Sequence, residues 1–166
     1  MSDEDAANRS LPVTLRPTGA EDEAFLLDVY SSTRADEMAQ APWSEAQRAA
    51  FLQMQFTAQQ RHYQAHFPKA THDVILFDKQ PAGRLYVDRR DAEIRILDIA
   101  LLPDYRKRGI GFALIKALMN ESAEAGKSLA IYVESYNPSR QLFERLGFLP
   151  IEDDGLNLLF EWRSGS

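Results

Sequence analysis

Apolar positions along the chain follow two periods, one typical of strands and one typical of helices. Alternating or continuous apolar runs predict strands at 13–16, 73–77, 84–88, 93–101, 129–133 and 156–162. Apolar residues spaced by three and four predict helices over 20–32, 44–66, 109–125 and 139–146, with a second short helix left open within 34–42. This order predicts an α+β fold, in which helices lie on a mixed, mostly antiparallel sheet.

Local signals fix several boundaries of these elements. Ser44 and Gln47 have the spacing of a capping box, and Gly126 suits the position just after a helix. The segment 78–83 contains Pro81 and Gly83 and is predicted to be the turn of a hairpin. Residues 1–11 are polar and acidic and are predicted to form a flexible tail, which leaves 12–163 as a single domain.

Composition narrows the classes of protein that fit. The chain has 166 residues, 45% of them hydrophobic, which is enough for one core. It has no cysteine, so disulfides and thiolate chemistry are excluded, and we expect a cytoplasmic protein. No apolar run reaches membrane-spanning length, and the net charge of −6 argues against general nucleic-acid binding. We therefore expect neither a membrane nor a nucleic acid as partner.

A basic, glycine-containing turn departs from this acidic background. Arg106-Lys107-Arg108-Gly109-Ile110-Gly111 stands between the strand 93–101 and the helix 109–125. The first turn of a helix has amide groups without intrahelical acceptors and carries partial positive charge. Glycines let a ligand approach the backbone closely. The turn therefore predicts an anion site, and a pyrophosphate is the ligand that suits it.

Three other kinds of site fit the sequence less well. A dinucleotide-binding fingerprint needs a third glycine where Leu114 stands, and a P-loop needs a Gly-Lys-Ser/Thr sequence that is absent. His62 and His66 are four residues apart, but no third metal ligand is evident, so no metal is expected.

Two further segments extend the pattern around the basic turn. Leu97-Asp98-Ile99-Ala100-Leu101-Leu102-Pro103-Asp104-Tyr105 leads into it, and Asn137-Pro138-Ser139-Arg140-Gln141-Leu142-Phe143-Glu144-Arg145-Leu146-Gly147-Phe148 follows the next strand. With these two segments and the R-x-x-G-x-G turn, the chain from Val13 to Trp162 resembles the GNAT superfamily of acyl-CoA-dependent N-acetyltransferases. The resemblance implies a six- to seven-stranded sheet with splayed central strands.

The resemblance also implies roles for the cofactor-binding residues. Backbone groups of Ile99, Ala100 and Leu101 would pair with the pantetheine arm of acetyl-CoA. The pyrophosphate would lie on the turn of Arg106, Lys107, Arg108, Gly109, Ile110 and Gly111. Further contacts are implied for Asn137, Arg140, Phe143 and Arg145.

One position departs from the family pattern. The family most often has a tyrosine where this chain has Phe143, and that hydroxyl is thought to protonate the departing thiolate. Phenylalanine has no proton to donate. Tyr136 is the nearby hydroxyl taken as a candidate substitute, and Tyr132 and Ser135 are others.

The implied reaction needs a base, since an alkyl ammonium must lose a proton before it attacks a thioester. Glu93, Asp98 and Glu134 are the candidates, and sequence does not choose among them. The alternative for Glu93 and Asp98 is a solvated position or an ion pair with Arg95 or Arg84. Glu93 and Asp98 are five residues apart on one strand, so simple alternation predicts that they point to opposite faces.

The acceptor amine is expected to bind in a pocket formed by the two N-terminal helices and the hairpin. Gln and aromatic residues are frequent there, and the predicted pocket residues are Trp43, Gln55, Gln59 and Tyr63. Arg34 would bind an acceptor carboxylate and Glu37 an ammonium group.

We expect an acetyl-CoA-dependent N-acetyltransferase that acts on a primary amine of a small molecule. The alternatives left open are a protein N-terminus or lysine as acceptor, a module that binds acyl-CoA without turnover, and an interaction domain that binds another polyanion. A homodimer is also left open.

Overall fold

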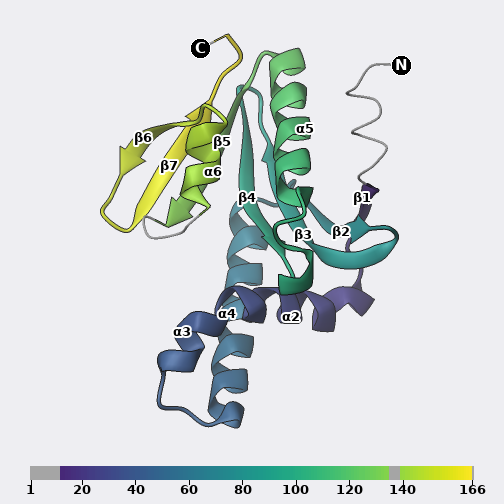
Figure 1. Ribbon diagram of the computed structural model, residues 1–166, viewed down its shortest axis with the longest axis vertical. Helices are drawn as coiled ribbons and strands as arrows, with labels where there is room; N and C mark the ends of the chain where they lie inside the picture. Colours follow the sequence, from purple (N-terminus) through teal and green to yellow (C-terminus); the bar gives the residue numbers. More distant parts are fainter. Residues whose placement is uncertain (1–11, 135–138, 166) are drawn as a thin grey trace.

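One mixed sheet organises the molecule. The computed structural model describes residues 12–134 and 139–165, and seven strands within them lie in the order β1–β2–β3–β4–β5–β7–β6 (Figure 1). Only β4 and β5 pair in parallel, whereas every other neighbouring pair is antiparallel. The predicted mixed, mostly antiparallel sheet is confirmed. The strands are β1 Val13–Pro17, β2 Thr71–Phe77, β3 Gln80–Arg89, β4 Glu93–Leu101, β5 Ser128–Glu134, β6 Leu149–Asp153 and β7 Asn157–Trp162.

The helices also follow the sequence pattern closely. They are η1 Ala20–Asp22, α2 Glu23–Thr33, α3 Ala35–Gln40, α4 Glu45–His66, η2 Pro103–Tyr105, α5 Ile110–Ala125 and α6 Arg140–Arg145. The predicted capping box of α4 is present, because Ser44 accepts from the Gln47 amide and the Gln47 side chain accepts from the Ser44 amide. The short helix left open within 34–42 is α3.

Buried apolar side chains form two clusters in the described residues. The main core joins α5 to the face that carries Leu85, Val87 and Ile96. A smaller cluster joins α2 to α4 through Leu26, Tyr30 and Phe56. In Figure 1, α5 lies against the sheet, whereas α3 and the first half of α4 extend beyond it.

Two predictions about strands are wrong. β6 was not predicted; it is an edge strand whose five residues are all exposed, and Pro150 is tolerated there because an edge leaves amides unpaired. The predicted turn 78–83 is shorter, because β3 begins at Gln80 and only Asp78 and Lys79 adopt the left-handed conformation of a two-residue hairpin turn. Pro81 is accommodated by a register shift between β2 and β3.

An ion pair joins β1 to the start of the first helical segment. Arg16 donates to both carboxylate oxygens of Asp22 at 2.8 Å, and the Gly19 amide donates to the same carboxylate at 2.8 Å. The hydrogen bonds from Arg16, followed by the one from Gly19, lower the pKa of Asp22 from 3.8 to about 2.

This pair predicts an acid-sensitive contribution to stability. Because the folded pKa of Asp22 lies below its ordinary value, the contribution is complete above pH 3.8 and is lost as the pH falls toward about 2. Asp22→Asn is expected to unfold at lower urea concentration at pH 6 and to lose less stability than the wild type between pH 4 and pH 2. The check is a series of urea titrations across this range. Equal pH dependence of the two proteins would contradict the prediction.

The predicted acidic tail, residues 1–11, lies outside the described residues. Among the residues that are described, no helix combines the length and the apolar character that crossing a membrane requires.

Candidate active site

The two central strands separate part-way along their length. β4 and β5 pair in parallel from Glu93 with Ser128 to Ile96 with Ile131, and their ladder ends there. β4 continues to Leu101 and β5 to Glu134 without pairing to each other. The predicted splay is confirmed. It leaves the backbone of Ile99, Ala100 and Leu101 unpaired with β5.

A bulge in β4 lies where this separation begins. Tyr86 of β3 pairs with Asp98, and the next residue, Val87, pairs with Ile96. Leu97 is therefore an extra residue in β4, as in a β-bulge. Its carbonyl oxygen accepts a hydrogen bond from the Tyr63 hydroxyl of α4 at 3.1 Å.

The bulge corrects the prediction about the two candidate bases on β4. Arg95 pairs with Asp88 and Asp98 pairs with Tyr86. Asp88 and Tyr86 are two residues apart and share a face, so Arg95 and Asp98 share a face too. Glu93 lies two residues before Arg95 and is on that face as well. The expectation that Glu93 and Asp98 point to opposite faces is wrong, because the extra residue shifts the alternation.

Asp98 is held by one of the two arginines that the sequence offers as its ion-pair partner. Arg84 of β3 is fully buried, and its Nε and Nη2 lie 2.7 and 2.6 Å from the same oxygen of Asp98, Oδ2. Nη2 also donates to Gln59 of α4. The Asp98 side chain is 28% exposed. Arg84 interrupts the apolar run from Pro81 to Val87, and its ion pair with Asp98 is the one that the sequence left open as an alternative to catalysis.

Glu93 is bound differently. Arg95 lies 3.1 Å and Arg90 3.4 Å from its Oε2, so two cations neutralise it at the end of β4 far from the basic turn. Glu134 ends β5, but its side chain is outside the described part of the chain, as is Tyr136.

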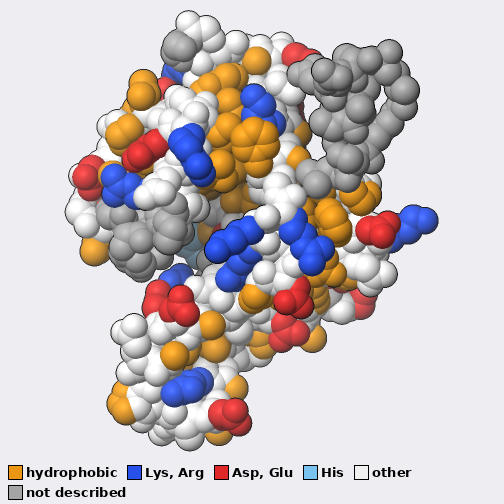
Figure 2. Space-filling model, viewed as in Figure 1, with side chains coloured by type: hydrophobic (Ala, Val, Ile, Leu, Met, Phe, Trp, Pro, Cys, Tyr) orange, Lys and Arg blue, Asp and Glu red, His pale blue; other side chains and the backbone are white. Residues whose placement is uncertain are grey.

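The basic turn has the backbone geometry of an anion site. Lys107 and Gly109 are both left-handed, with φ of 62° and 85°, and Gly109 caps α5. A Cβ placed on Gly111 would have no atom within 4 Å. The first turn of α5 holds no acidic residue, so no carboxylate of that turn offsets its partial positive charge. Figure 2 shows Lys and Arg side chains gathered on this face, over the start of α5.

Two of the three cations at this turn contact other parts of the protein. Arg106 donates to the Leu101 carbonyl at 2.9 Å and to the Ser32 hydroxyl of α2 at 3.2 Å. Arg108 lies over the rings of Tyr105 and Phe77, at 5.5 and 5.7 Å. All three cations at 106–108 are exposed, so their charge lies beside the open start of α5.

The predicted acceptor-pocket residues are only partly brought together. Gln59 and Tyr63 meet the sheet at Arg84 and Leu97. Gln55 is one turn earlier on α4 and accepts from Tyr30 at 3.2 Å. Trp43 packs on Phe51 instead, and Tyr63 stands twelve positions after Phe51 on the same helix, about 18 Å along its axis.

The remaining two acceptor candidates bind each other. Arg34 and Glu37 form an ion pair at 3.1 Å, and the Arg34 guanidinium lies 5.5 Å from the centre of the Tyr30 ring. The structure therefore gives no direct support to separate carboxylate- and ammonium-binding roles for them.

The helix that follows β5 carries the remaining predicted cofactor residues. Phe143 of α6 is buried and packs against Phe148 and Phe160, with ring centres 5.3 and 6.2 Å apart. Arg140 lies 3.4 Å from Glu144, and Arg145 is exposed. Asn137 lies outside the described residues.

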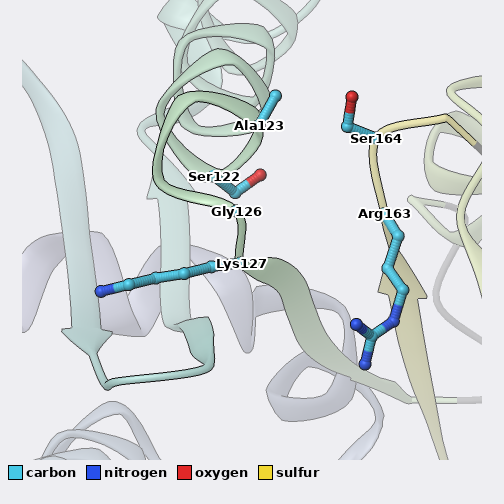
Figure 3. A pocket seen from close by; sticks show the side chains of 6 residues that line it. All are labelled: Ser122, Ala123, Gly126, Lys127, Arg163 and Ser164. Carbon is cyan, nitrogen blue, oxygen red and sulfur yellow. The ribbon is translucent and has the colours of Figure 1, made fainter.

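A hollow of about 180 Å³ lies elsewhere, at the other end of α5. Ser122, Gly126 and Arg163 are among the residues that line it, and the Lys127 side chain points away from Arg163 (Figure 3). The 16 residues of α5, about 24 Å of helix, separate it from the basic turn. It is therefore not part of the slot between β4 and β5. No cluster of three or more His, Cys, Asp or Glu suited to a metal occurs in residues 12–134 and 139–165.

Comparison with known proteins identifies the family. The model of the acetyltransferase (GNAT) family matches residues 30–148, which include the splayed strands and the basic turn. The chain belongs to this family. As a GNAT protein it is an acyltransferase, and the resemblance found in the sequence is confirmed. A search of curated protein sequences found no match.

Solved structures share the GNAT fold at low sequence identity. The PaiA N-acetyltransferase of Thermoplasma acidophilum, in complex with coenzyme A, is 16% identical with a TM-score of 0.68, over 91% of this chain and 98% of that one. An acetyltransferase of Thermus thermophilus is 16% identical with a TM-score of 0.65, over 92% and 97%. An acetyltransferase of Streptococcus agalactiae is 16% identical with a TM-score of 0.61, over 92% and 98%.

Proposed function

We propose that this GNAT protein transfers the acetyl group of acetyl-CoA to a primary amine of a small molecule. The observation that carries the proposal is the separation of β4 from β5 after Ile96, next to the glycine turn that opens α5. A slot with unpaired backbone on one side and an anion site at its end suits a pantetheine arm that carries a pyrophosphate.

In this proposal the cofactor lies along β4. Backbone groups of Ile99, Ala100 and Leu101 pair with the amides of the pantetheine arm, as an added strand would. The amide groups at the start of α5 bind the pyrophosphate, and the cations at 106–108 add charge. Arg140, Arg145 and Asn137 remain proposed contacts for the rest of the cofactor.

Asp98 is the base that the geometry favours. Both contacts from Arg84 go to Oδ2, so Oδ1 is left to accept from an acceptor amine. Glu93 by contrast is bound by two arginines. The neutral amine forms the new C–N bond at the thioester carbonyl, and its proton passes to Asp98. A backbone amide near Ile99 stabilises the oxyanion.

The leaving thiolate needs no tyrosine at position 143 in this scheme. Phe143 is buried among Phe148 and Phe160, so it acts as core. When the C–S bond breaks, a thiol with an ordinary pKa of about 8.5 leaves as a thiolate that water can protonate. The resulting products are the N-acetylated amine and CoA.

A small acceptor is favoured over a folded protein because α4 covers this side of the site. Gln59, Tyr63 and the fully buried Arg84 lie around Asp98. Only 28% of the Asp98 side chain is exposed, so the amine has to enter a confined space to reach it.

A thiol-release assay tests the proposed function. Purified protein, acetyl-CoA and a panel of small primary amines are expected to release CoA thiol, and mass spectrometry should find the amine heavier by one acetyl group. Peptides with a free N-terminus or lysine serve as competing acceptors. Turnover of peptides alone would contradict the small-molecule proposal, and binding of CoA without any turnover would contradict the enzymatic one.

Gly111 offers a separate test of cofactor binding. Alanine at this position meets open space in the free protein and suits a helix better than glycine, so Gly111→Ala is expected to raise the free energy of unfolding by about 0.5 kcal/mol. The added methyl group stands where the pyrophosphate would approach, so calorimetry should show at least about tenfold weaker CoA binding. Unchanged CoA affinity would contradict the placement of the pyrophosphate.

A further inference from the structure

Two side chains from outside β4 contact its bulge, and a third side chain contacts one of them. The Tyr63 hydroxyl donates to the Leu97 carbonyl at 3.1 Å. Arg84 binds the Oδ2 atom of the next residue, Asp98, through both Nε and Nη2. The Gln59 side chain in turn accepts from Nη2 of Arg84. The backbone and side chain at residues 97–98 are thus fixed from two directions.

One face of α4 supplies this contact set. Phe56, Gln59 and Tyr63 are spaced by three and four residues and therefore lie on the same side of the helix. Phe56 is buried and lies over Arg84 at 6.0 Å, while the Tyr63 ring packs against Tyr86 at 4.9 Å. The helix that covers the acceptor side is thereby tied to the residue at which the slot opens.

Packing alone does not explain why the buried side chain at position 84 is an arginine. Arg84 is 0% exposed, and its Nη1 atom has no hydrogen-bond partner among the described residues. Burying a charge with one donor unsatisfied costs free energy that an apolar side chain would not cost. An arginine here is therefore better explained by the orientation it imposes on Asp98 than by stability.

We propose that Tyr63, and Gln59 acting through Arg84, are positioning residues that hold the β4 bulge in the geometry needed for acetyl transfer. Tyr63 fixes the Leu97 carbonyl and with it the direction of the amide groups that follow. Gln59 fixes Arg84, which turns Oδ1 of Asp98 toward the acceptor. This assignment rests on the proposed N-acetyltransferase function.

Removal of one hydroxyl tests the role of Tyr63. Tyr63→Phe keeps the ring on Tyr86 but frees the Leu97 carbonyl, and kcat is expected to fall at least about tenfold while KM for acetyl-CoA stays within about twofold. Tyr30→Phe is the matched control, because it removes a hydrogen bond between α2 and α4 that does not touch β4. It is expected to keep kcat within about twofold.

A pair of substitutions tests Gln59. Gln59→Leu removes the oxygen that accepts from Arg84, and kcat is expected to fall as in Tyr63→Phe. Gln59→Glu keeps an acceptor oxygen, so its kcat is expected to stay much closer to the wild-type value than the kcat of Gln59→Leu. Equal kcat in the wild type, Gln59→Leu and Gln59→Glu would overturn the role of Gln59.

Amide hydrogen exchange provides a readout that does not depend on turnover. In Tyr63→Phe, amides of residues 97–101 are expected to exchange faster, while those of α5 and β7 keep their wild-type rates. Uniformly faster exchange throughout the core, or a kcat loss equal to that of Tyr30→Phe, would overturn the positioning role. If the wild type released no thiol with any amine, the proposed function would fail, and the exchange pattern would still decide whether Tyr63 holds the bulge.

Discussion

Asp98→Ala is expected to abolish acetyl transfer and also to destabilise the fold. The substitution removes the proposed base, and a positioned base contributes about 10²–10⁴-fold to such reactions. It also leaves the fully buried Arg84 without its anionic partner. Breaking a buried ion pair on one side costs about 3–5 kcal/mol, and the partial exposure of Asp98 places the expected loss at about 3 kcal/mol.

The two effects of this substitution can be separated. Asp98→Asn keeps an oxygen that can accept from Arg84 but cannot take a proton from the amine, so it is expected to unfold closer to the wild type and yet lose activity as Asp98→Ala does. Thiol release at a temperature where all variants are folded measures activity, and urea unfolding measures stability. Full activity in Asp98→Asn would exclude Asp98 as the base.

Asp88 provides a matched control for the stability effect. It is buried on the same face, and it pairs with Arg90 at 2.8 Å. Because the Arg90 side chain is 41% exposed, water can solvate it after Asp88→Ala. We expect a smaller loss of stability than in Asp98→Ala, since exposed ion pairs contribute about 1 kcal/mol or less. An equal loss would indicate that burial of the arginine does not determine the effect.

Much of the fold follows from local sequence signals. The capping box at Ser44 and Gln47 fixed the start of α4, and Gly126 fixed the end of α5, because both signals act through nearby backbone groups. β6 escaped prediction because an exposed edge strand has no buried face to impose alternation. The hairpin turn was predicted too long, because whether Pro81 and Gly83 break a strand depends on the neighbouring strand.

The candidate site was harder to predict for a related reason. The glycine turn and the apolar run before it are contiguous in sequence, so the family motif is enough to predict an anion site there and a cofactor-pairing role for the backbone of Ile99 and Leu101, and both stay predictions. The bulge at Leu97 is a property of the pairing between β3 and β4. Its mark in the sequence is the apolar pair Ile96-Leu97, which interrupts the alternation and which a simple count from Glu93 to Asp98 overlooks. Without the bulge, the shared face of Glu93 and Asp98 could not be derived, although the sequence did offer Arg84 as an ion-pair partner of Asp98.

Gly83→Ala is expected to damage the fold far more than Gly111→Ala. Gly83 of β3 pairs with Leu101 of β4, and a Cβ at this position would lie 2.0 Å from the Ala100 carbonyl oxygen and 2.9 Å from the Leu101 Cα. Both atoms belong to the backbone, so no side chain can rotate out of the way. Overpacking of this kind costs about 1–3 kcal/mol, and displacement of paired backbone places Gly83→Ala at the upper end.

The same substitution bears on the cofactor slot. The end of β4 has to move to accept the new methyl group, and Ala100 and Leu101 are the residues proposed to pair with the pantetheine arm. Gly83→Ala is therefore expected to weaken CoA binding in calorimetry and to unfold at lower urea concentration, whereas Gly111→Ala should weaken binding without loss of stability. If Gly83→Ala bound CoA as tightly as the wild type despite the displaced strand, the pantetheine arm would not lie along Ala100 and Leu101.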